Sequence, residues 1–138
     1  MTFSIVARSA DGQQHGIAVA SKFLAVGSAV PAAEAQIGAL ATQAYANLTY
    51  RQTGLAMLLA GIAAADVVTG LTAADPDREH RQLGVVGASG DGATYTGKEC
   101  HDWAGGLTGD GYAIQGNILA GPEVVEAMRT AWLDDDQP

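Results

Sequence analysis

The apolar residues of this chain change their spacing twice along the sequence, and this order limits the fold more than any other feature. Four short runs rich in Ala, Val and Gly come first, at residues 2–7, 15–20, 23–30 and 35–45. Asp11-Gly12 separates the first two runs with a turn signal, so the chain is expected to begin with a β-hairpin. Small residues at this density favour sheets that pack closely on another layer.

The spacing then becomes helical. Leucine, valine and isoleucine recur at helical intervals over 49–62 and 63–71, with Gly61 and Gly70 where these two helices are expected to end. Further strands are expected at 83–88, 93–96 and 111–117. A last helix is predicted over 122–133, because Pro122 and an acidic residue stand in its first turn.

This order of elements predicts an α+β domain in which helices cover antiparallel sheets. A chain of 138 residues without a repeat, a linker or a low-complexity segment is expected to form one domain over residues 1–138. The segment from Trp103 to Gly111 is rich in glycine and is interpreted as a loop that can wall a pocket.

Composition excludes several classes of function. The net charge of −8 and the lack of a Lys/Arg cluster argue against binding to nucleic acid or to anionic membranes. A lone cysteine, Cys100, cannot form an internal disulfide, and no leader or apolar run of about 20 residues is present. A soluble, cytoplasmic protein is therefore expected. The neighbours Cys100, His101 and Asp102 cannot all surround one ion, so neither a metal nor another cofactor is expected.

Thr2 follows the initiator methionine and heads the first apolar run. Because a small second residue allows Met1 to be removed, Thr2 can become the N-terminus. It would then carry a hydroxyl nucleophile and a free amine with an ordinary pKa near ~8, a base able to take the hydroxyl proton. The alternative is that this is an ordinary Met-Thr start without a chemical role.

Five blocks of sequence resemble the DUF1028 family, in order and without a large gap. They are residues 2–8, 19–27, 41–47, 75–82 and 112–121. The resemblance implies a fold like that of the N-terminal nucleophile (Ntn) hydrolases, with two antiparallel sheets between helical layers. Members of the family continue for tens of residues past the helix that matches 122–133. The chain is therefore expected to be a shortened form, or to close its sheets differently and expose an edge that favours a homodimer.

The resemblance also implies a catalytic role for Thr2, which would attack an acyl carbon, and for Lys22, whose charge would lower the pKa of the Thr2 amine. The alternative for Lys22 is an exposed residue that closes a hairpin. Ser4 is a second hydroxyl on the same strand, but it has no free amine and is expected to point into the interior.

Amide side chains inside apolar strands must find a partner or a substrate, because leaving them unpaired costs about 1–3 kcal/mol. Asn117 is a candidate oxyanion donor. Three further amides are candidate substrate-binding groups: Gln43, Asn47 and Gln115. The alternative for Gln115 and Asn117 is a pair of core amides that satisfy a β-bulge.

His80 and Arg81 are candidate ligands for a substrate carboxylate, because arginine holds carboxylates with two parallel hydrogen bonds. The alternative is a solvated loop with local ion pairs. Two classes of function remain open. One is an amidohydrolase that cleaves the C–N bond of a small amide, carbamoyl or ureido compound through Thr2. The other is an inactive module that binds a metabolite or a partner chain.

Overall fold

The computed structural model describes residues 1–134 and contains two antiparallel four-stranded sheets and four helices. The first sheet has the order β2-β1-β8-β7, formed by His15–Ser21, Thr2–Arg8, Tyr112–Asn117 and Gly105–Gly109. The second has the order β3-β4-β5-β6, formed by Pro31–Glu34, Gly38–Ala44, Arg81–Gly87 and Gly92–Thr96. The helices are α1 (Val26–Ala29), α2 (Thr49–Leu59), α3 (Ala64–Ala73) and α4 (Glu123–Asp134), with a 3₁₀ turn, η1, at Arg78–His80.

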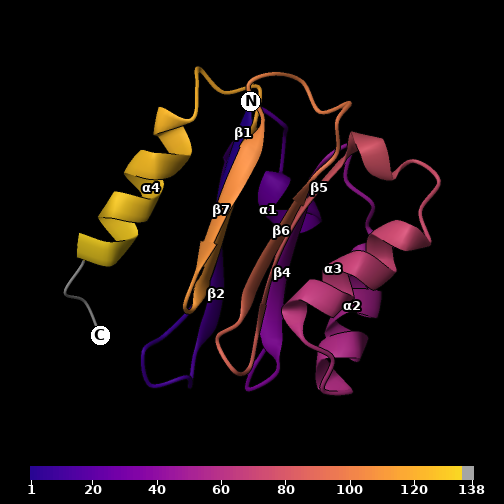
Figure 1. Ribbon diagram of the computed structural model, residues 1–138, viewed down its shortest axis with the longest axis vertical. Coiled ribbons are helices and arrows are strands. Elements are labelled where there is room, and N and C mark those ends of the chain that lie inside the picture. Colours follow the sequence, from indigo (N-terminus) through magenta and orange to yellow (C-terminus); the bar gives the residue numbers. More distant parts are fainter. Residues whose placement is uncertain (135–138) are drawn as a thin grey trace.

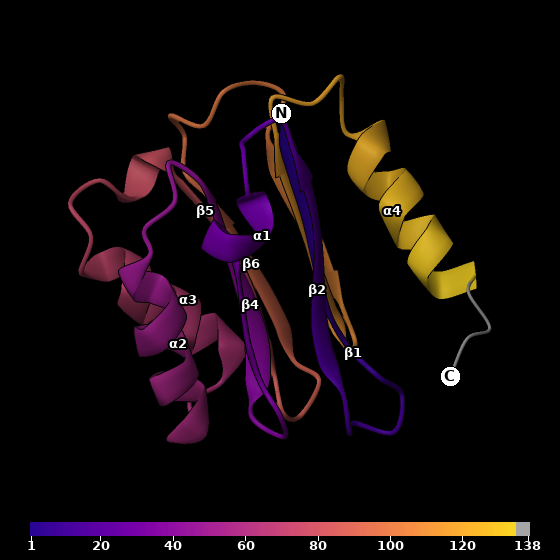
Figure 2. The same ribbon diagram turned by 180° about the vertical axis from the view of Figure 1, so that it is seen from behind.

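The two sheets lie face to face with helices on their outer sides (Figures 1 and 2). Helix α4 lies outside the first sheet, against β7 and β8, while α2 and α3 cover the second sheet. The expected α+β domain with antiparallel sheets is therefore confirmed. Residues 135–138, part of the expected single domain, lie outside the described residues.

Small side chains fill the space between the sheets. The buried cluster there is made of Val6, Val30, Ala39, Ala41, Val86 and Ala113. The outer faces carry larger residues: Leu40 and Leu83 pack against α2 and α3, and Ile114 packs under α4. Small residues on the inner faces let the sheets approach closely, as the composition of the strands indicates.

Part of the predicted order is wrong. The expected strand at 23–30 is absent, and the four-residue helix α1 occupies this part of the chain. Ala25, just before it, has φ 56°, a left-handed conformation that ends any extended strand. The expected strand at 35–45 begins only at Gly38, as β4, and a separate short strand, β3, begins at Pro31. Runs of Ala and Val suit strands and helices alike, so composition did not distinguish the two.

The loop expected from Trp103 to Gly111 contains a strand, β7, that pairs with β8. The spacing of apolar residues did not indicate this strand because it is rich in glycine. At two of these glycines, neighbouring atoms leave no room for a side chain. A Cβ at Gly105 would meet the Trp103 ring, and one at Gly106 would meet the Ile114 carbonyl and the Thr94 side chain. Gly70 lies inside α3, which continues to Ala73.

A polar layer crosses the space between the sheets near one end. Ser4 donates to Gln43 Oε1 (2.7 Å), Gln43 Nε2 donates to Gln82 Oε1 (2.8 Å), and Gln115 Nε2 donates to Ser4 Oγ (2.6 Å). Asn117 Nδ2 also donates to Gln82 Oε1, at 3.0 Å. All five side chains are buried. This network fixes the sheets relative to each other, because each broken bond would leave a buried polar group without a partner.

Gly84 is expected to tolerate no side chain, since a Cβ there would overlap the Gln115 amide. We predict that Gly84→Ala lowers the free energy of unfolding by about 1–3 kcal/mol, because the enclosed amide has little room to move. Gly16→Ala, on strand β2 where nothing lies within 4 Å of the added Cβ, is the matched control. Urea unfolding of both variants measures the difference, and equal stability of the two would contradict the role assigned to the polar layer.

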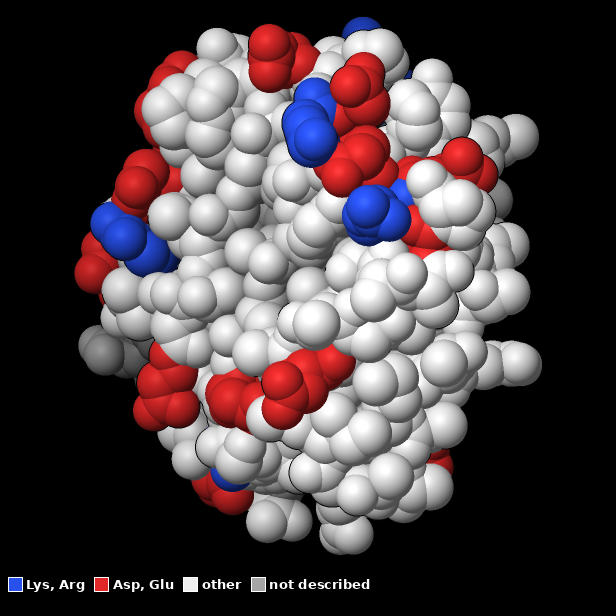
Figure 3. Space-filling model, turned by 45° about the vertical axis from the view of Figure 1, so that its right-hand side comes forward, with Lys and Arg blue, Asp and Glu red and all other residues white. Residues whose placement is uncertain are grey.

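None of the helices in residues 1–134 has the length and apolar character that a membrane-spanning segment requires. On the face drawn in Figure 3, basic groups lie beside acidic ones. Ion pairs in the described part of the chain include Arg78 with Glu79 and Arg81 with Asp77.

Candidate functional site

Thr2 is the first residue of β1, a central strand that pairs with β2 on one side and with β8 on the other. Its Cα lies opposite Ser21 at the end of β2 and opposite Asn117 at the end of β8. Antiparallel pairing thus brings together three polar residues that are far apart in sequence, and all three lie at one end of the sheet.

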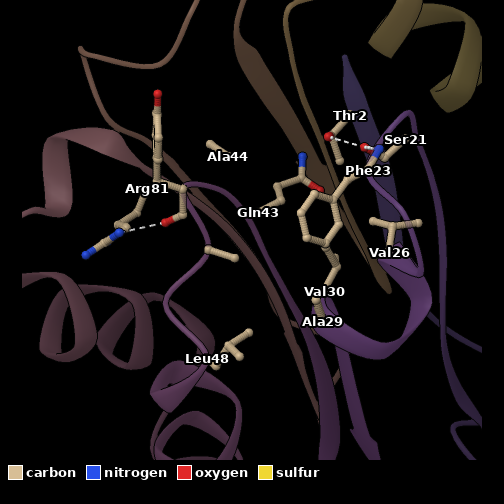
Figure 4. A pocket seen from close by; sticks show the side chains of 12 residues that line it. Thr2, Ser21, Phe23, Val26, Ala29, Val30, Gln43, Ala44, Leu48 and Arg81 are labelled. Carbon is tan, nitrogen blue, oxygen red and sulfur yellow. Dashed lines mark hydrogen bonds between the residues drawn. The ribbon is translucent and has the colours of Figure 1, made fainter.

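Two pockets meet at Thr2. The larger has a volume of about 460 Å³ and the smaller about 370 Å³, and both are lined by Thr2, Ser21, Phe23, Ala44 and Tyr45. Figure 4 shows the larger pocket, with Thr2 and Ser21 at one end and Arg81 at the other. A hydroxyl on the boundary between two pockets can reach a bond whose two substituents occupy different spaces.

Ser21 was not singled out by the sequence analysis, yet it is the side chain bonded to Thr2. The Oγ atoms of the two residues are 2.8 Å apart. Ser21 Oγ also donates to the Met1 carbonyl (3.1 Å) and accepts from the Phe23 backbone N–H (3.0 Å). The register of the predicted hairpin was the signal that could have found it, because extending that pairing to its open end places residue 21 opposite residue 2.

Ser21 has one hydroxyl proton, and this decides which residue is the donor in its hydrogen bond with Thr2. A hydroxyl has one proton, and that proton goes to the Met1 carbonyl, which can only accept. Thr2 is therefore the donor in the Thr2–Ser21 bond while Met1 is attached. In this state the proton that a Thr2 nucleophile must lose points to Ser21 Oγ, which accepts it in a hydrogen bond.

Lys22 and Asn117 both line the smaller pocket, together with His101 and Met1. The Lys22 side chain is exposed, and within residues 1–134 no carboxylate lies within 4.0 Å of its ammonium. Asn117 is 4% exposed and uses its amide N–H on Gln82. The structure thus brings Thr2, Lys22 and Asn117 to one pocket wall.

Gln43 and Gln115 lie in the polar layer behind Thr2. Gln43 also lines the larger pocket, but its Oε1 accepts from Ser4 of the other sheet and its Nε2 donates to Gln82 of its own sheet. Gln115 donates to Ser4, and its Oε1 has no hydrogen-bond partner among the described residues. Both amides therefore bond to side chains inside the protein, Ser4 and Gln82.

Asn47 and Arg81 converge on Asp75, a residue that the sequence analysis did not select. Asp75 Oδ2 accepts from Arg81 Nε (2.9 Å), from Asn47 Nδ2 (3.0 Å) and from the hydroxyl of Tyr50 (2.8 Å). The bond from Arg81, helped by those from Asn47 and Tyr50, holds the pKa of Asp75 well below the usual value for an aspartate. Burial, with the Asp75 charge beside it, raises the pKa of Tyr50.

His80 lies on the surface beside Tyr45, with ring centroids 5.6 Å apart and the rings edge to face. Tyr45 also contacts the ring of His101, at 6.3 Å. Arg81 donates to the Tyr45 carbonyl at 2.8 Å, so η1 and the start of β5 hold the segment that lines both pockets.

The rim of the two pockets exposes large apolar side chains. The exposed fractions are 66% for Phe23, 59% for Tyr45, 50% for Leu48 and 48% for Ile118. Ala44 and Ile118 also have positive φ values, 65° and 54°, which are uncommon for alanine and rare for a β-branched residue. Exposed apolar groups and strained backbone together are typical of a ligand-binding site.

No group of three or more His, Cys, Asp or Glu side chains among residues 1–134 is arranged to hold a metal ion. The polar and nucleophilic side chains that line the smaller pocket include those of Thr2, Ser21, Lys22, Cys100, His101 and Asn117.

Comparison with known proteins identifies the family. No protein of curated function matches the chain. A crystal structure of a Silicibacter pomeroyi protein described by the DUF1028 family model has 32% sequence identity and a TM-score of 0.94. That match covers 99% of this chain and 64% of that protein, so the chain spans less than two thirds of its length. The model of DUF1028, a family of unknown function, matches residues 2–138, and the chain belongs to this family.

Proposed function

We propose that the protein is an N-terminal nucleophile hydrolase that cleaves the C–N bond of a small amide, carbamoyl or ureido compound. The observation that carries the proposal is the position of Thr2, at the end of a central strand and on the boundary between two pockets. The facing sheets with outer helices fit the layered fold of such hydrolases. The activity needs no cofactor.

The reaction begins when Met1 is removed and Thr2 carries a free α-amine. The Thr2 Oγ attacks the carbonyl carbon, and its proton passes to the α-amine. The C–N bond then breaks as the α-amine gives that proton to the leaving nitrogen. A water molecule next attacks the ester on Thr2, releases the acid and restores the hydroxyl. The balance is one amide and one water to one acid and one amine.

Loss of Met1 would change the hydrogen bonds of Thr2. The Met1 carbonyl is the acceptor of the Ser21 proton, so its departure frees that proton. Ser21 can then donate to Thr2 Oγ1, and the Thr2 proton is released toward the new amine. Met1 also lines the smaller pocket, which becomes larger when the residue leaves. Removal of one residue thus supplies the base, reorients the hydroxyls and opens the site.

Lys22 and Asn117 have the supporting roles in this proposal. The Lys22 ammonium, on the same pocket wall as Thr2, favours the neutral form of the α-amine by charge repulsion. Asn117 provides an amide beside the attacked carbonyl. Gln43 and Gln115 hold the strands that carry these groups, and Asn47, His80 and Arg81 support the segment around Tyr45 that closes the pockets.

The second candidate function is a module that binds a small metabolite without turnover. It is favoured by the direction of the Thr2–Ser21 bond, since Thr2 has no adjacent base while Met1 remains. Both pockets exist in that state as well. A second copy of the chain is proposed as a further partner, at an exposed sheet edge.

A β-lactone probe distinguishes the two candidates. We expect the untagged protein to lose Met1 and to gain the mass of one lactone on Thr2, because the activated hydroxyl opens the strained ring. Intact-mass and peptide mass spectrometry measure both events. An unlabelled protein that retains Met1 would favour the binding module.

A further inference from the structure

The two pockets that meet at Thr2 differ in their chemistry. Apart from the residues shared with the smaller pocket, the larger one is walled mainly by aliphatic side chains: Val26, Ala29, Val30, Ala46 and Leu48. The Phe23 ring stands in front of this wall (Figure 4). This wall suits a branched aliphatic or aromatic group.

The polar groups of the larger pocket are already engaged. Arg81 uses its Nε on Asp75 and its Nη1 on the Tyr45 carbonyl, so its charge is neutralised by a buried carboxylate. Gln43 is bonded within the polar layer. A charged substituent in this pocket would lose its water without gaining a free partner, whereas an apolar substituent would not.

The smaller pocket is also partly apolar, lined by Met1 and Ile118 among others, but it adds Lys22, a cation that the larger pocket lacks. Lys22 contributes a cation with no acidic partner among residues 1–134, and His101 also lines this pocket. In a chain with a net charge of −8, a pocket-lining ammonium that meets no carboxylate of the described residues is a distinctive feature. It provides an attractive position for a carboxylate, which the larger pocket does not offer.

We infer that the substrate is a small amide with an apolar group on one side of the scissile bond and a carboxylate on the other, as in an N-acyl amino acid. The inference rests on the proposed function, because it places the C–N bond at Thr2 with one substituent in each pocket. Hydrolysis of such a compound adds one water across the C–N bond and releases a carboxylic acid and an amino acid.

Binding to the Thr2→Ala variant tests the two subsites without turnover. The probes for isothermal titration calorimetry are N-(3-methylbutanoyl)glycine, its uncharged glycinamide analogue, and N-acetylglycine, which lacks the branched chain. We expect the first to bind at least about tenfold more tightly than either of the others, since each analogue removes one of the two interactions.

Variants assign each preference to its pocket. In the Thr2→Ala background, Lys22→Ala is expected to abolish the preference for the carboxylate, and Lys22→Arg to preserve it. Val26→Phe, which fills the larger pocket, is expected to abolish the preference for the branched chain. Circular dichroism of each variant verifies the fold. As an internal control, each variant should retain the preference that belongs to the unaltered pocket.

The outcomes separate this inference from the proposed function. Equal affinity for the three compounds, or no binding of any, would overturn the two-subsite inference even if a β-lactone labels Thr2. Selective binding together with failure of the lactone to label Thr2 would support the two subsites but contradict the proposed hydrolase function.

Discussion

Replacing Thr2 by alanine is expected to lower the hydrolysis of N-(3-methylbutanoyl)glycine by about 10⁴-fold or more. The substitution removes the oxygen that attacks in the proposed mechanism, and loss of a nucleophile that acts with its base removes nearly the whole catalytic effect. Release of glycine, measured by amine derivatisation, gives kcat/KM. The variant is expected to fold, because Thr2 is partly exposed and its side chain bonds only to Ser21 among the described residues.

Thr2→Ser is the matched control for this experiment. Serine keeps a hydroxyl and, once Met1 is removed, a free amine on the same residue, so substantial activity should remain. Ser4 cannot substitute for the lost hydroxyl, since it is fully buried and bonded to Gln43 and Gln115. Undiminished hydrolysis by Thr2→Ala would refute a nucleophilic role for Thr2.

Much of the fold could be predicted because the apolar spacing is regular where elements are regular. The hairpin of β1 and β2, the helices α2, α3 and α4, and β8 all lie close to their predicted positions. The prediction failed where contacts between distant parts of the chain, and not the local spacing of apolar residues, determine the element. Strand β7 exists because β8 offers it a pairing edge, and α1 forms where the Ala25 backbone turns the chain away from an extended course.

The residues of the candidate site could be predicted only in part. Thr2 could be selected from its place in the chain, and the amides from the cost of burying them unpaired. The pairing of Thr2 with Asn117 depends on β1 lying next to β8, a contact between the two ends of the chain that no local pattern encodes. Pockets are likewise products of packing, so the contrast between their walls was not visible in the sequence.

Asp75 illustrates the remaining limit. The segment Asp75-Pro76-Asp77 indicates a turn, and a turn aspartate is usually exposed. The structure instead buries Asp75 to 5% exposure and surrounds it with donors from α2, from the loop before it and from β5. A sequence shows that Arg81 needs an anionic partner, but the fold decides whether that partner is a substrate or a side chain.

Removing this carboxylate is expected to produce the largest loss of stability among single substitutions outside the apolar core. Asp75→Ala would leave Arg81, with a side chain only 16% exposed, without its buried carboxylate partner, and would deprive Tyr50 and Asn47 of their acceptor. Breaking a buried pair on one side costs about 3–5 kcal/mol of unfolding free energy. Urea unfolding near pH 7 measures the loss.

Asp77→Asn provides the control, because that side chain is 69% exposed and meets Arg81 only at 3.5 Å, so its effect should stay within about 0.5 kcal/mol. The pH dependence gives a second readout. Since the pKa of Asp75 is lower in the folded state, its contribution is complete above the unfolded value of 3.8 and is lost as the pH falls through the folded value. Asp75→Asn should therefore be less stable at neutral pH yet lose less stability than the wild type below pH ~4. Parallel stability curves for Asp75→Asn and the wild type would contradict this assignment and place the acid sensitivity on other carboxylates.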